Sequence, residues 1–340
     1  MFNRKLNIVV TGANGQLGSY LTRYFREKSF FKNSNIGQVF GIDVNELDIR
    51  NKTDVDNFFN SYSSNPPIKI DYVIHCAAAT NTSDIENDPI KYYAANCIGT
   101  KNIAEACVDN GIKLIFISTD YVLSEYSLVS GDVIQEFPIN QYGLQKLIAE
   151  HFVKEAYKDK QKDYMILRSS WMFGNSSNSF VEKFLTNVFR TYANDDGKSP
   201  KVKVNVVDDA YGRPTPVSFI TTMVDNVMSE KRHGTCNAQH FAPQISRYDW
   251  ATMIWDAFTR PEVDCDDKRY DIVKKLETAI ELVPIKSTDL NLNMRHPGKV
   301  YDNGIQLNDN NVFIKDTREY VSKNWLKYVD LANEIILKKA

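Results

Sequence analysis

Long hydrophobic runs and an excess of charge of one sign are both absent from this sequence. No stretch reaches the roughly 20 consecutive apolar residues that a membrane-spanning helix needs. The 41 basic and 43 acidic residues give a formal net charge of −2, whereas a nucleic-acid or anionic-membrane surface needs a basic excess on one face. A predicted strand starts at Leu6, and no apolar targeting segment precedes it. We therefore expect a cytoplasmic protein without a membrane or nucleic-acid partner.

Cysteine and histidine are scarce, which bears on disulfides and metal sites. The five cysteines are odd in number and include no Cys-x-x-Cys pair. A disulfide framework is therefore not expected, and a reducing compartment fits the composition better. None of the five histidines belongs to a His-x-x-x-His pair at helical spacing, so no zinc site is predicted.

The first half of the sequence alternates short apolar runs with helical patterns. Strands that are apolar throughout and separated by helices are typical of a parallel sheet covered on both faces. The sequence therefore predicts an α/β fold with a Rossmann-type doubly wound parallel sheet. The predicted strands are Leu6–Val10, Val39–Ile42, Tyr72–His75, Leu114–Ile117 and Tyr164–Leu167, and the predicted helices are Leu17–Phe25, Pro89–Asn110 and Tyr142–Tyr157.

The length of 340 residues allows two domains, and the strand–helix rhythm weakens after Trp171. We expect residues 1–170 to form an NAD(P)-binding Rossmann domain. A return segment at about residues 202–230, with a strand at Val202–Val207, is expected to join it. Residues from about 171 to 200 and from 235 to 340 are expected to form a smaller C-terminal substrate-binding lobe.

A glycine-rich loop follows the first predicted strand and opens the first helix. Its first glycine permits the tight turn, its second lets the backbone approach a pyrophosphate, and its third lets the helix pack on the sheet. The helix N-terminus then offers N–H groups to the phosphates. The alternative is an incidental glycine-rich turn, which the strand–loop–helix context disfavours. The predicted cofactor-binding residues here are Gly12, Asn14, Gly15, Gln16, Leu17 and Gly18.

Asp43 ends the second predicted strand, where a carboxylate can accept both hydroxyls of the adenosine ribose. The same carboxylate would repel a 2′-phosphate, and no Lys or Arg follows before Arg50. The cofactor is therefore expected to be NADH or NADPH, with NADH favoured by Asp43. Alternatively, Asp43 merely starts a turn with Asn45.

Two further segments are expected to touch the cofactor. Asp48 and Ile49 lie in a short segment that could cover the adenine, with the carboxylate facing its exocyclic amine. Small side chains follow the third predicted strand, which suits backbone lying against a cofactor, although simple tight packing explains them nearly as well. These residues are Cys76, Ala77, Ala78 and Ala79.

The predicted catalytic residues are Thr119, Tyr142 and Lys146. Thr119 follows a strand end, the edge where ligands bind in open α/β folds. Tyr142 and Lys146 are four residues apart and share one helix face. A free phenol has a pKa of ~10, and we expect a nearby ammonium to lower it. Thr119 would hold the substrate oxygen, Tyr142 would pass it a proton, and the cofactor would deliver hydride to the carbonyl carbon. By itself, such a pair could also be solvent-facing.

With these motifs in this order, the sequence resembles the extended short-chain dehydrogenase/reductase family over nearly the whole chain. The segment Ile117–Val122 is similar to the Ser-Thr-Asp-Tyr-Val-Phe motif of dTDP-4-dehydrorhamnose reductases within that family. Leu167–Trp171 and Asp209–Thr215 are similar to two further motifs of those reductases. Sugar-nucleotide 4,6-dehydratases carry Asp-Glu after the catalytic threonine, whereas here Tyr121 follows Asp120, so reduction is favoured over elimination.

This resemblance implies roles for several residues. Thr119 and Tyr142 would contact the 4-keto oxygen, and Tyr121 and Trp171 would line the sugar pocket. Asn96 matches the helix asparagine that supports the catalytic lysine. Lys146 can also hydrogen-bond the nicotinamide ribose, and Asn96, Tyr142 and Lys146 complete the predicted cofactor-binding set. The complete implied substrate-binding set is Ser118, Thr119, Tyr121, Trp171, Arg213, Arg295 and Lys299.

Three places depart from the family pattern. Leu123-Ser124-Glu125 replaces the usual Phe-Asp-Gly, and Arg295–Val300 keeps only the proline of the usual Arg-Pro-x-Asn-Ser. Arg213, Arg295 and Lys299 are candidate diphosphate partners, or else surface charges. Tyr20 stands where some members carry a glutamate that helps to bind magnesium between subunits, so no metal is predicted. A monomer or a homodimer is expected.

The sequence therefore leads to one main hypothesis and two alternatives. The main hypothesis is NAD(P)H-dependent reduction of the 4-keto group of a nucleotide-linked 6-deoxy sugar, with dTDP-4-dehydrorhamnose giving dTDP-L-rhamnose. The first alternative is a reductase or epimerase of another nucleotide-linked keto-sugar. The second is a non-catalytic, dinucleotide-binding regulatory subunit, against which the retained Thr119, Tyr142 and Lys146 argue.

Overall fold

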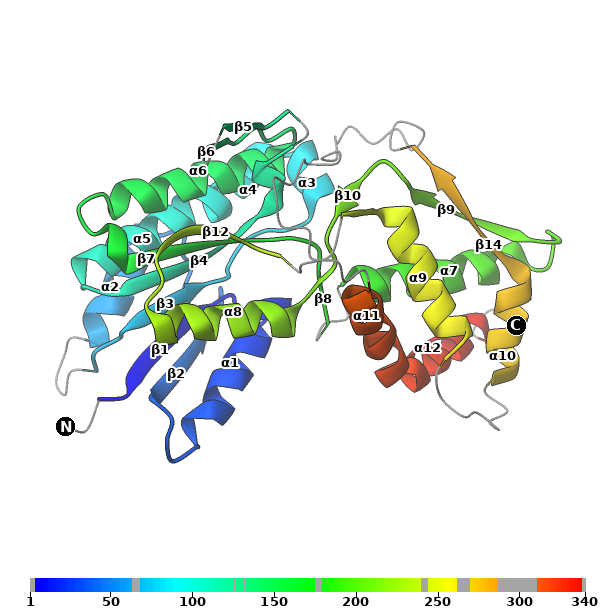
Figure 1. Ribbon diagram of the computed structural model, residues 1–340, viewed down its shortest axis with the longest axis horizontal. Coiled ribbons are helices and arrows are strands. Elements are labelled where there is room, and N and C mark those ends of the chain that lie inside the picture. The colour runs from blue at the N-terminus through cyan, green and yellow to red at the C-terminus, as the bar shows by residue number, and fades with distance from the viewer. Residues whose placement is uncertain are drawn as a thin grey trace. The chain divides into compact units, whose positions relative to one another are not determined.

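A six-stranded sheet organises the N-terminal half of the chain in the computed structural model (Figure 1). All of its strand pairs are parallel, and the strand order is β12-β7-β4-β3-β1-β2. This confirms the predicted Rossmann-type fold class. The strands are β1 (Leu6–Thr11), β2 (Ile36–Ile42), β3 (Tyr72–His75), β4 (Lys113–Thr119), β7 (Tyr164–Ser169) and β12 (Gly234–Ala238).

The structure describes residues 4–62, 68–124, 126–130, 133–174, 179–239, 244–261, 270–286 and 311–337. The described residues of Met1–Ser170 and Val217–Gln239 form a first compact unit. Those of Trp171–Pro216, His240–Leu292 and His296–Ala340 form a second unit. Within the described residues, no helix combines the length and the apolar character needed to cross a membrane.

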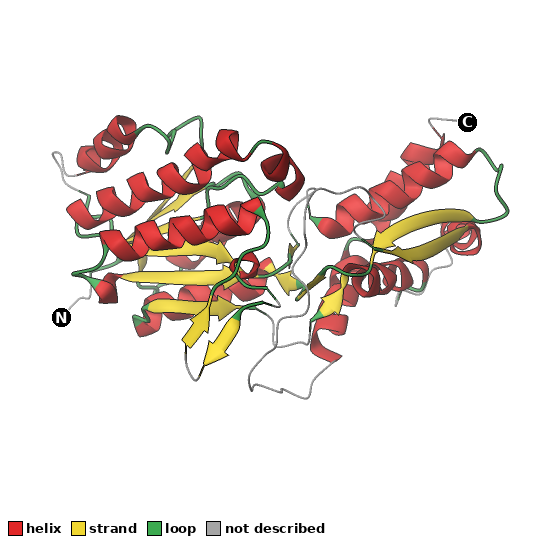
Figure 2. Ribbon diagram, turned by 90° about the horizontal axis from the view of Figure 1, so that it is seen from above, coloured by secondary structure: helices red, strands yellow, loops and turns green. Residues whose placement is uncertain are grey.

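Helices cover both faces of the sheet in the first unit (Figures 1 and 2). On one face α1 (Gln16–Ser29) packs against α8 (Val217–Glu230). On the other face α5 (Gly99–Asp109) packs between α2 (Lys52–Tyr62) and α6 (Gln141–Ala156). This second layer and the sheet share a core that buries Val9, Val73, Ile103, Phe116, Val153 and Ile166 completely.

The predicted helix Pro89–Asn110 is interrupted. It consists of α4 (Pro89–Tyr93), a π-helical turn η1 (Ala94–Ile98) and α5. Asp88 caps its start, because the Asp88 side chain accepts a hydrogen bond from Lys91 N at 3.2 Å. Since π-helical turns are rare and are found mostly at functional sites, the position of η1 draws attention to its residues.

Four smaller elements complete the first unit around its sheet edge. They are α3 (Thr82–Asn87), the 3-10 turns η2 (Asp120–Val122) and η3 (Gln161–Asp163), and a hairpin formed by β5 (Leu128–Ser130) and β6 (Val133–Gln135).

The second unit is built from helices and short strand pairs. β9 pairs with β14, β8 with β11, and β10 with β13. Its elements are β8 (Met172–Phe173), α7 (Phe180–Asp195), β9 (Val202–Val207), β10 (Tyr211–Gly212), β11 (Thr215–Pro216), β13 (Ile245–Ser246), α9 (Arg247–Thr259), α10 (Tyr270–Ala279), β14 (Ile280–Ile285), α11 (Asn311–Lys323) and α12 (Trp325–Leu337).

The return segment differs from the one predicted at about residues 202–230. The strand Val202–Val207 does form, but it lies in the second unit and pairs with β14. Its burial alternates along the strand, which suits a half-covered two-stranded sheet better than a sheet covered on both faces. The chain returns to the first unit through α8 and β12, so residues 235–239 belong there and not to the predicted lobe.

Candidate functional site

The loop after β1 has the geometry of a phosphate cradle. Gly12 adopts φ +67°, and a Cβ there would lie 2.8 Å from the backbone of Ala77. Only glycine fits this close approach of two backbone segments. The helix α1 then starts at Gln16, with Gly15 as its N-cap. Its first turn therefore offers backbone N–H groups and the positive end of the helix dipole, which together can bind an anion.

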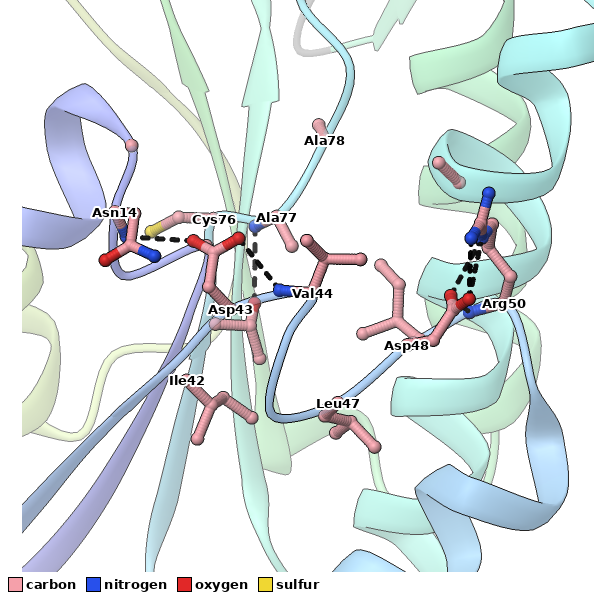
Figure 3. A pocket seen from close by; sticks show the side chains of 15 residues that line it. Asn14, Ile42, Asp43, Val44, Leu47, Asp48, Arg50, Cys76, Ala77 and Ala78 are labelled. Carbon is pink, nitrogen blue, oxygen red and sulfur yellow. Dashed lines mark hydrogen bonds and ion pairs between the residues drawn. The ribbon is translucent and has the colours of Figure 1, made fainter.

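A cavity of about 430 Å³ lies beside this loop (Figure 3). It brings together most of the predicted cofactor residues: Gly12, Asn14, Gly15, Asp43, Asp48, Ile49, Cys76, Ala77 and Ala78. The other predicted cofactor residues are outside its lining: Gln16, Leu17, Gly18, Ala79, Asn96, Tyr142 and Lys146. Leu17 is 4% exposed and packs into the core.

Asp43 stands on the cavity wall with both carboxylate oxygens engaged (Figure 3). Oδ2 accepts a hydrogen bond from Asn14 N, and Oδ1 accepts one from Val44 N, each at 2.8 Å. The carboxylate therefore ties the end of β2 to the glycine loop. Because each oxygen has a second lone pair, it retains the capacity to accept a ribose hydroxyl.

Asp48 forms an ion pair with Arg50, a cavity residue without a predicted role (Figure 3). Arg50 Nε lies 2.8 Å from Asp48 Oδ1, and its NH2 lies 2.6 Å from Oδ2. Hydrogen bonding to Arg50 lowers the pKa of Asp48. Arg50 is the one arginine among the described residues of the cavity wall, and it is already paired with a carboxylate.

A chain of buried hydrogen bonds runs beneath the cavity floor. Thr11 Oγ1 accepts from Ala77 N at 3.2 Å and lies 2.7 Å from His75 Nδ1. His75 Nε2 lies 3.1 Å from Thr100 Oγ1, which donates to Asn96 O. Burial lowers the pKa of His75 to about 3, so the imidazole is neutral at physiological pH. This chain connects the end of β1, the segment after β3 and the π-helical turn.

The three predicted catalytic residues meet at the carboxyl end of β4. Thr119 is the last residue of β4, and α6 presents Tyr142 in its first turn and Lys146 one turn later. The start of α6 is fixed by Asn140, whose side chain accepts from Gly143 N at 2.8 Å. The ring of Tyr121 packs edge-on against Tyr142, with centroids 6.1 Å apart.

Tyr142 is held in its neutral form. Burial raises its pKa, and electrostatic interactions with Tyr121 and Asp120 raise it further, while a hydrogen bond with Thr119 opposes the change. A protonated phenol beside a threonine hydroxyl is suited to donate a proton to a carbonyl oxygen.

Lys146 differs from its expected role. Its ammonium donates to Ile117 O at 2.8 Å and lies 4.0 Å from the centre of the Phe116 ring. Burial lowers the Lys146 pKa to about 8, and the Glu150 carboxylate counteracts this. The prediction that the ammonium lowers the pKa of Tyr142 is therefore wrong for this structure, because burial dominates at the phenol and the ammonium points to a carbonyl.

Asn96 also differs from its expected role. It lies in the π-helical turn and holds the segment after β3: its Oδ1 accepts from Ala79 N at 2.8 Å, and its Nδ2 donates to Ala79 O at 3.2 Å. Nδ2 also donates to Gln145 Oε1 at 2.9 Å. Asn96 thus positions a predicted cofactor-binding backbone and hydrogen-bonds the side chain of Gln145, the residue before Lys146.

Ser118 is turned away from the predicted substrate position. Its hydroxyl is 2% exposed and donates to Glu150 Oε1 at 2.6 Å. Successive side chains of a strand point to opposite faces, so Ser118 and Thr119 cannot share one ligand face. The substrate-binding prediction for Ser118 is corrected to a structural contact between β4 and α6.

In the second unit, Trp171 belongs to an aromatic stack. Its ring lies 5.6 Å from that of Trp250 with an interplanar angle of 16°, and the Arg247 guanidinium lies 3.7 Å from its ring centroid. A Cβ at Gly212 would lie 2.6 Å from the Trp171 Nε1, so the stack requires glycine there. Among the described residues, the indole N–H of Trp171 has no hydrogen-bond partner.

Arg213 is 8% exposed, and its carbonyl accepts from Thr215 Oγ1 at 2.9 Å. Arg295 and Lys299 lie outside the described residues. In the part of the chain that is described, no three His, Cys, Asp or Glu side chains are grouped as they would be around a metal ion.

Sequence reasoning missed Gln145, Glu150, Arg168 and His75. Two signals were available: Arg168 interrupts an apolar strand, where a charge needs a partner, and His75 ends another. Nothing local marked Gln145.

Comparison with known proteins points to one family. The RmlD substrate binding domain family matches residues 6–300. A dTDP-4-dehydrorhamnose reductase of Aggregatibacter actinomycetemcomitans is 29% identical over 259 residues, which cover 73% of this chain and 78% of that protein.

Two solved structures are similar over most of the chain. The structure of a dTDP-4-dehydrorhamnose reductase from Clostridium acetobutylicum has a TM-score of 0.70 and 27% identity, and covers 94% of this chain and 99% of that one. The Bacillus anthracis reductase, solved in complex with NADP, has a TM-score of 0.66 and 22% identity over 98% of this chain and 99% of its own, and therefore shows the shared fold.

Proposed function

The chain belongs to the RmlD substrate binding domain family, and from this premise we propose that it is a reductase that uses NADH or NADPH to reduce the 4-keto group of a nucleotide-linked 6-deoxy sugar. The substrate that its relatives favour is dTDP-4-dehydrorhamnose, which would become dTDP-L-rhamnose. The match over residues 6–300 confirms the resemblance to this group of reductases that the sequence motifs indicated.

One observation carries this proposal: Thr119, a neutral Tyr142 and Lys146 converge at the carboxyl end of β4. Thr119 would hold the keto oxygen, and Tyr142 would donate its phenolic proton to that oxygen as the carbonyl becomes an alcohol. When bound, the dinucleotide supplies the hydride that adds to the carbonyl carbon. Lys146, charged below its pKa of about 8, would hydrogen-bond the nicotinamide ribose.

The cavity fits such a dinucleotide. Gly12 leaves room that a Cβ would fill, and Gly15 opens α1 towards a pyrophosphate. Asp43 would take the ribose hydroxyls, and Asp48 and Ile49 would cover the adenine. In this proposal the first unit binds the cofactor, and the second binds the sugar nucleotide through Trp171 and Arg213, with Arg295 and Lys299 as further candidates.

We propose a preference for NADH over NADPH. Asp43 and Asp48 both place carboxylates on the cavity wall, and the charge of Arg50 is paired with Asp48. A 2′-phosphate would therefore meet negative charge without an available cation. The variant Asp43→Asn should raise the ratio of kcat/KM for NADPH to that for NADH by about tenfold, whereas Glu46→Gln, which removes a neighbouring carboxylate, should leave it unchanged. A wild-type preference for NADPH would contradict the assignment.

The activity is tested by incubating the protein with dTDP-4-dehydrorhamnose and NADH, following absorbance at 340 nm and identifying the product by chromatography. Stoichiometric cofactor oxidation with formation of dTDP-L-rhamnose is expected. A parallel panel of keto-sugars on other nucleotide bases tests the alternative substrates. No turnover of any of them with NADH or NADPH would refute the proposal.

A further inference from the structure

A buried charged cluster lies behind Lys146, and the proposed reaction gives it no task. It consists of Glu150, Arg168 and Ser118, which are 0%, 4% and 2% exposed. Burying a carboxylate and a guanidinium costs free energy unless both are well paired, and such a pair is often no more stabilising than apolar residues of the same size. Fold stability alone therefore gives a weak account of this cluster.

The sheet register brings the cluster together. Ser118 on β4 and Arg168 on β7 are direct cross-strand neighbours, so their side chains project from the same face. Glu150 reaches that face from α6. Its Oε1 accepts from Ser118 Oγ at 2.6 Å and from Arg168 Nε at 2.9 Å, and its Oε2 accepts from Arg168 NH2 at 2.6 Å.

Two adjacent attachments therefore join α6 to the end of β4. Lys146 Nζ donates to Ile117 O, and the next strand residue, Ser118, donates to Glu150, which is one helical turn after Lys146. Thr119 follows directly on the strand. The geometry of this double attachment determines how far the Thr119 hydroxyl lies from the side chains of α6.

Glu150 differs in charge from the other titratable groups that act on Lys146. Four titratable groups act on this lysine: His75 at the end of β3, Cys76 directly after β3, Cys97 in η1 and Glu150 on α6. Burial lowers the pKa of His75 to about 3 and raises the pKa of Cys76 and of Cys97 to about 12, so these three groups are neutral near pH 7. Of the groups in the described chain that act on Lys146, Glu150 alone carries a negative charge there.

We propose that Glu150 is a positioning residue for the reduction: fixed by Arg168 and Ser118, it holds α6 on the end of β4 and keeps the buried Lys146 in its ammonium form. The role of Glu150 in catalysis rests on the proposed function. The effect of Glu150 on the protonation of Lys146 does not, because it can be measured without substrate.

The test is the variant Glu150→Gln, which keeps the side-chain shape and removes the charge. Protein labelled with ¹³C-lysine is titrated by NMR without ligand, and the Lys146 signal is identified by its loss in Lys146→Met. The Lys146 titration and the alkaline limb of the kcat/KM profile should both move to lower pH by about half a unit or more, because a nearby opposite charge favours the ammonium. At pH 8, a shift of half a unit from a Lys146 pKa of about 8 lowers the ammonium fraction about twofold, so kcat should fall about twofold or more while KM for the sugar changes little.

Two matched variants separate this role from a purely structural one. Glu136→Gln removes a carboxylate from the same Arg168, whose NH2 lies 2.5 Å from Glu136 Oε1, and should leave the Lys146 titration in place. Ser118→Ala removes one attachment but no charge, so it should lower kcat without moving the alkaline limb. Circular dichroism checks that each variant folds.

An unmoved Lys146 titration in folded Glu150→Gln would overturn the inference, as would an equal shift in Glu136→Gln. Failure of the proposed function has a different signature: the wild-type protein would turn over no sugar while the NMR titration still responded to Glu150→Gln.

Discussion

Two predicted site residues, one in each unit, are buried in opposite ways. Lys146 in the first unit is held by directional contacts: a carbonyl acceptor, the face of Phe116 and the charge of Glu150. Trp171 in the second unit is held by ring stacking against Trp250 and Arg247, and its indole N–H has no partner among the described residues.

This difference indicates which property of each unit, its chemistry or its stability, responds first to a substitution. Around Lys146, one altered charge or hydroxyl changes the protonation and direction of a functional group, so chemistry should respond before stability does. Around Trp171, the contacts are mostly dispersion and apolar burial, which depend on volume and less on direction. There stability should respond first. The following four variants test this contrast, beginning with the largest effect.

Tyr142→Phe should break function in the first unit with little structural change. Removing the proton donor should lower kcat by about 10² to 10⁴, while the melting temperature and NADH binding stay near those of the wild type. Steady-state kinetics and fluorescence titration provide the measurements. Tyr164→Phe, a tyrosine on β7 outside the site, is the control, and a Tyr142→Phe rate as high as that control would remove Tyr142 from its role.

Trp250→Ala should show the reverse behaviour in the second unit. Trp250 is 0% exposed and stacks on Trp171 and Phe180, with Phe180 4.7 Å away between centroids. Its truncation should cost about 3–5 kcal/mol of unfolding free energy, measured by urea denaturation. Trp255→Ala, on the same helix but partly exposed, should cost less. The contrast between units fails if the two variants are equally destabilised.

His75 tests whether the polar network also contributes a pH-dependent term to stability. Unfolded, His75 binds a proton below its ordinary pKa of 6.5, whereas in the fold burial lowers that pKa to about 3. Below pH 6.5 the unfolded chain binds a proton at His75 and the folded protein does not. Protonation of His75 therefore leaves the free energy of unfolding unchanged above pH 6.5 and lowers it progressively as the pH falls towards 3. From pH 7 to pH 5, the loss through this group should be about 2 kcal/mol.

The check is urea denaturation of His75→Gln at both pH values. This variant should lack that part of the pH dependence, while His151→Gln, which changes an exposed histidine, should keep it. Identical pH dependence in all three proteins would show that His75 does not couple folding to protonation.

Ser246→Ala should have the smallest effect and sharpens the picture of the second unit. Ser246 caps α9, the helix that carries Trp250: its Oγ accepts from Asp249 N at 3.0 Å, and Asp249 Oδ2 accepts from Ser246 N in return. Losing this cap should cost about 1 kcal/mol, again by urea denaturation, with kcat unchanged at saturating substrate. Ser246→Thr, which keeps the hydroxyl, should stay close to the wild type.

Sequence patterns were sufficient to predict the strands that are buried on both faces. Short, continuously apolar runs such as Ile8–Val10 and Leu114–Ile117 are typical of strands in a parallel sheet that helices cover on both faces. They failed for β12, whose Thr235 and Asn237 are polar. An edge strand needs little apolar character once β7 supplies its hydrogen bonds. Val202–Val207 was found as a strand, but its alternating burial, which decides its unit, depends on its partner β14.

The cofactor cavity was more predictable than the surroundings of the catalytic residues. A glycine loop and a strand-end carboxylate are local signals, and the cavity brings both together. The direction of the Ser118 hydroxyl could have been derived from strand alternation beside Thr119. The π-helical turn at Asn96 could not, because it depends on tertiary bonds to Ala79 and Gln145.

The double engagement of Asp43 has a consequence for redesign of the cofactor specificity. The residue that would be exchanged first to admit a 2′-phosphate is also the acceptor for Asn14 N and Val44 N. Replacing Asp43 with a small or basic side chain would remove its repulsion of the 2′-phosphate. The same change would also remove the hydrogen bond that ties the glycine loop to β2. Redesign should therefore begin at Asp48, because its substitution would free the Arg50 guanidinium on the cavity wall and keep the loop tethered to Asp43, with the loss of the proposed Asp48 contact to the adenine.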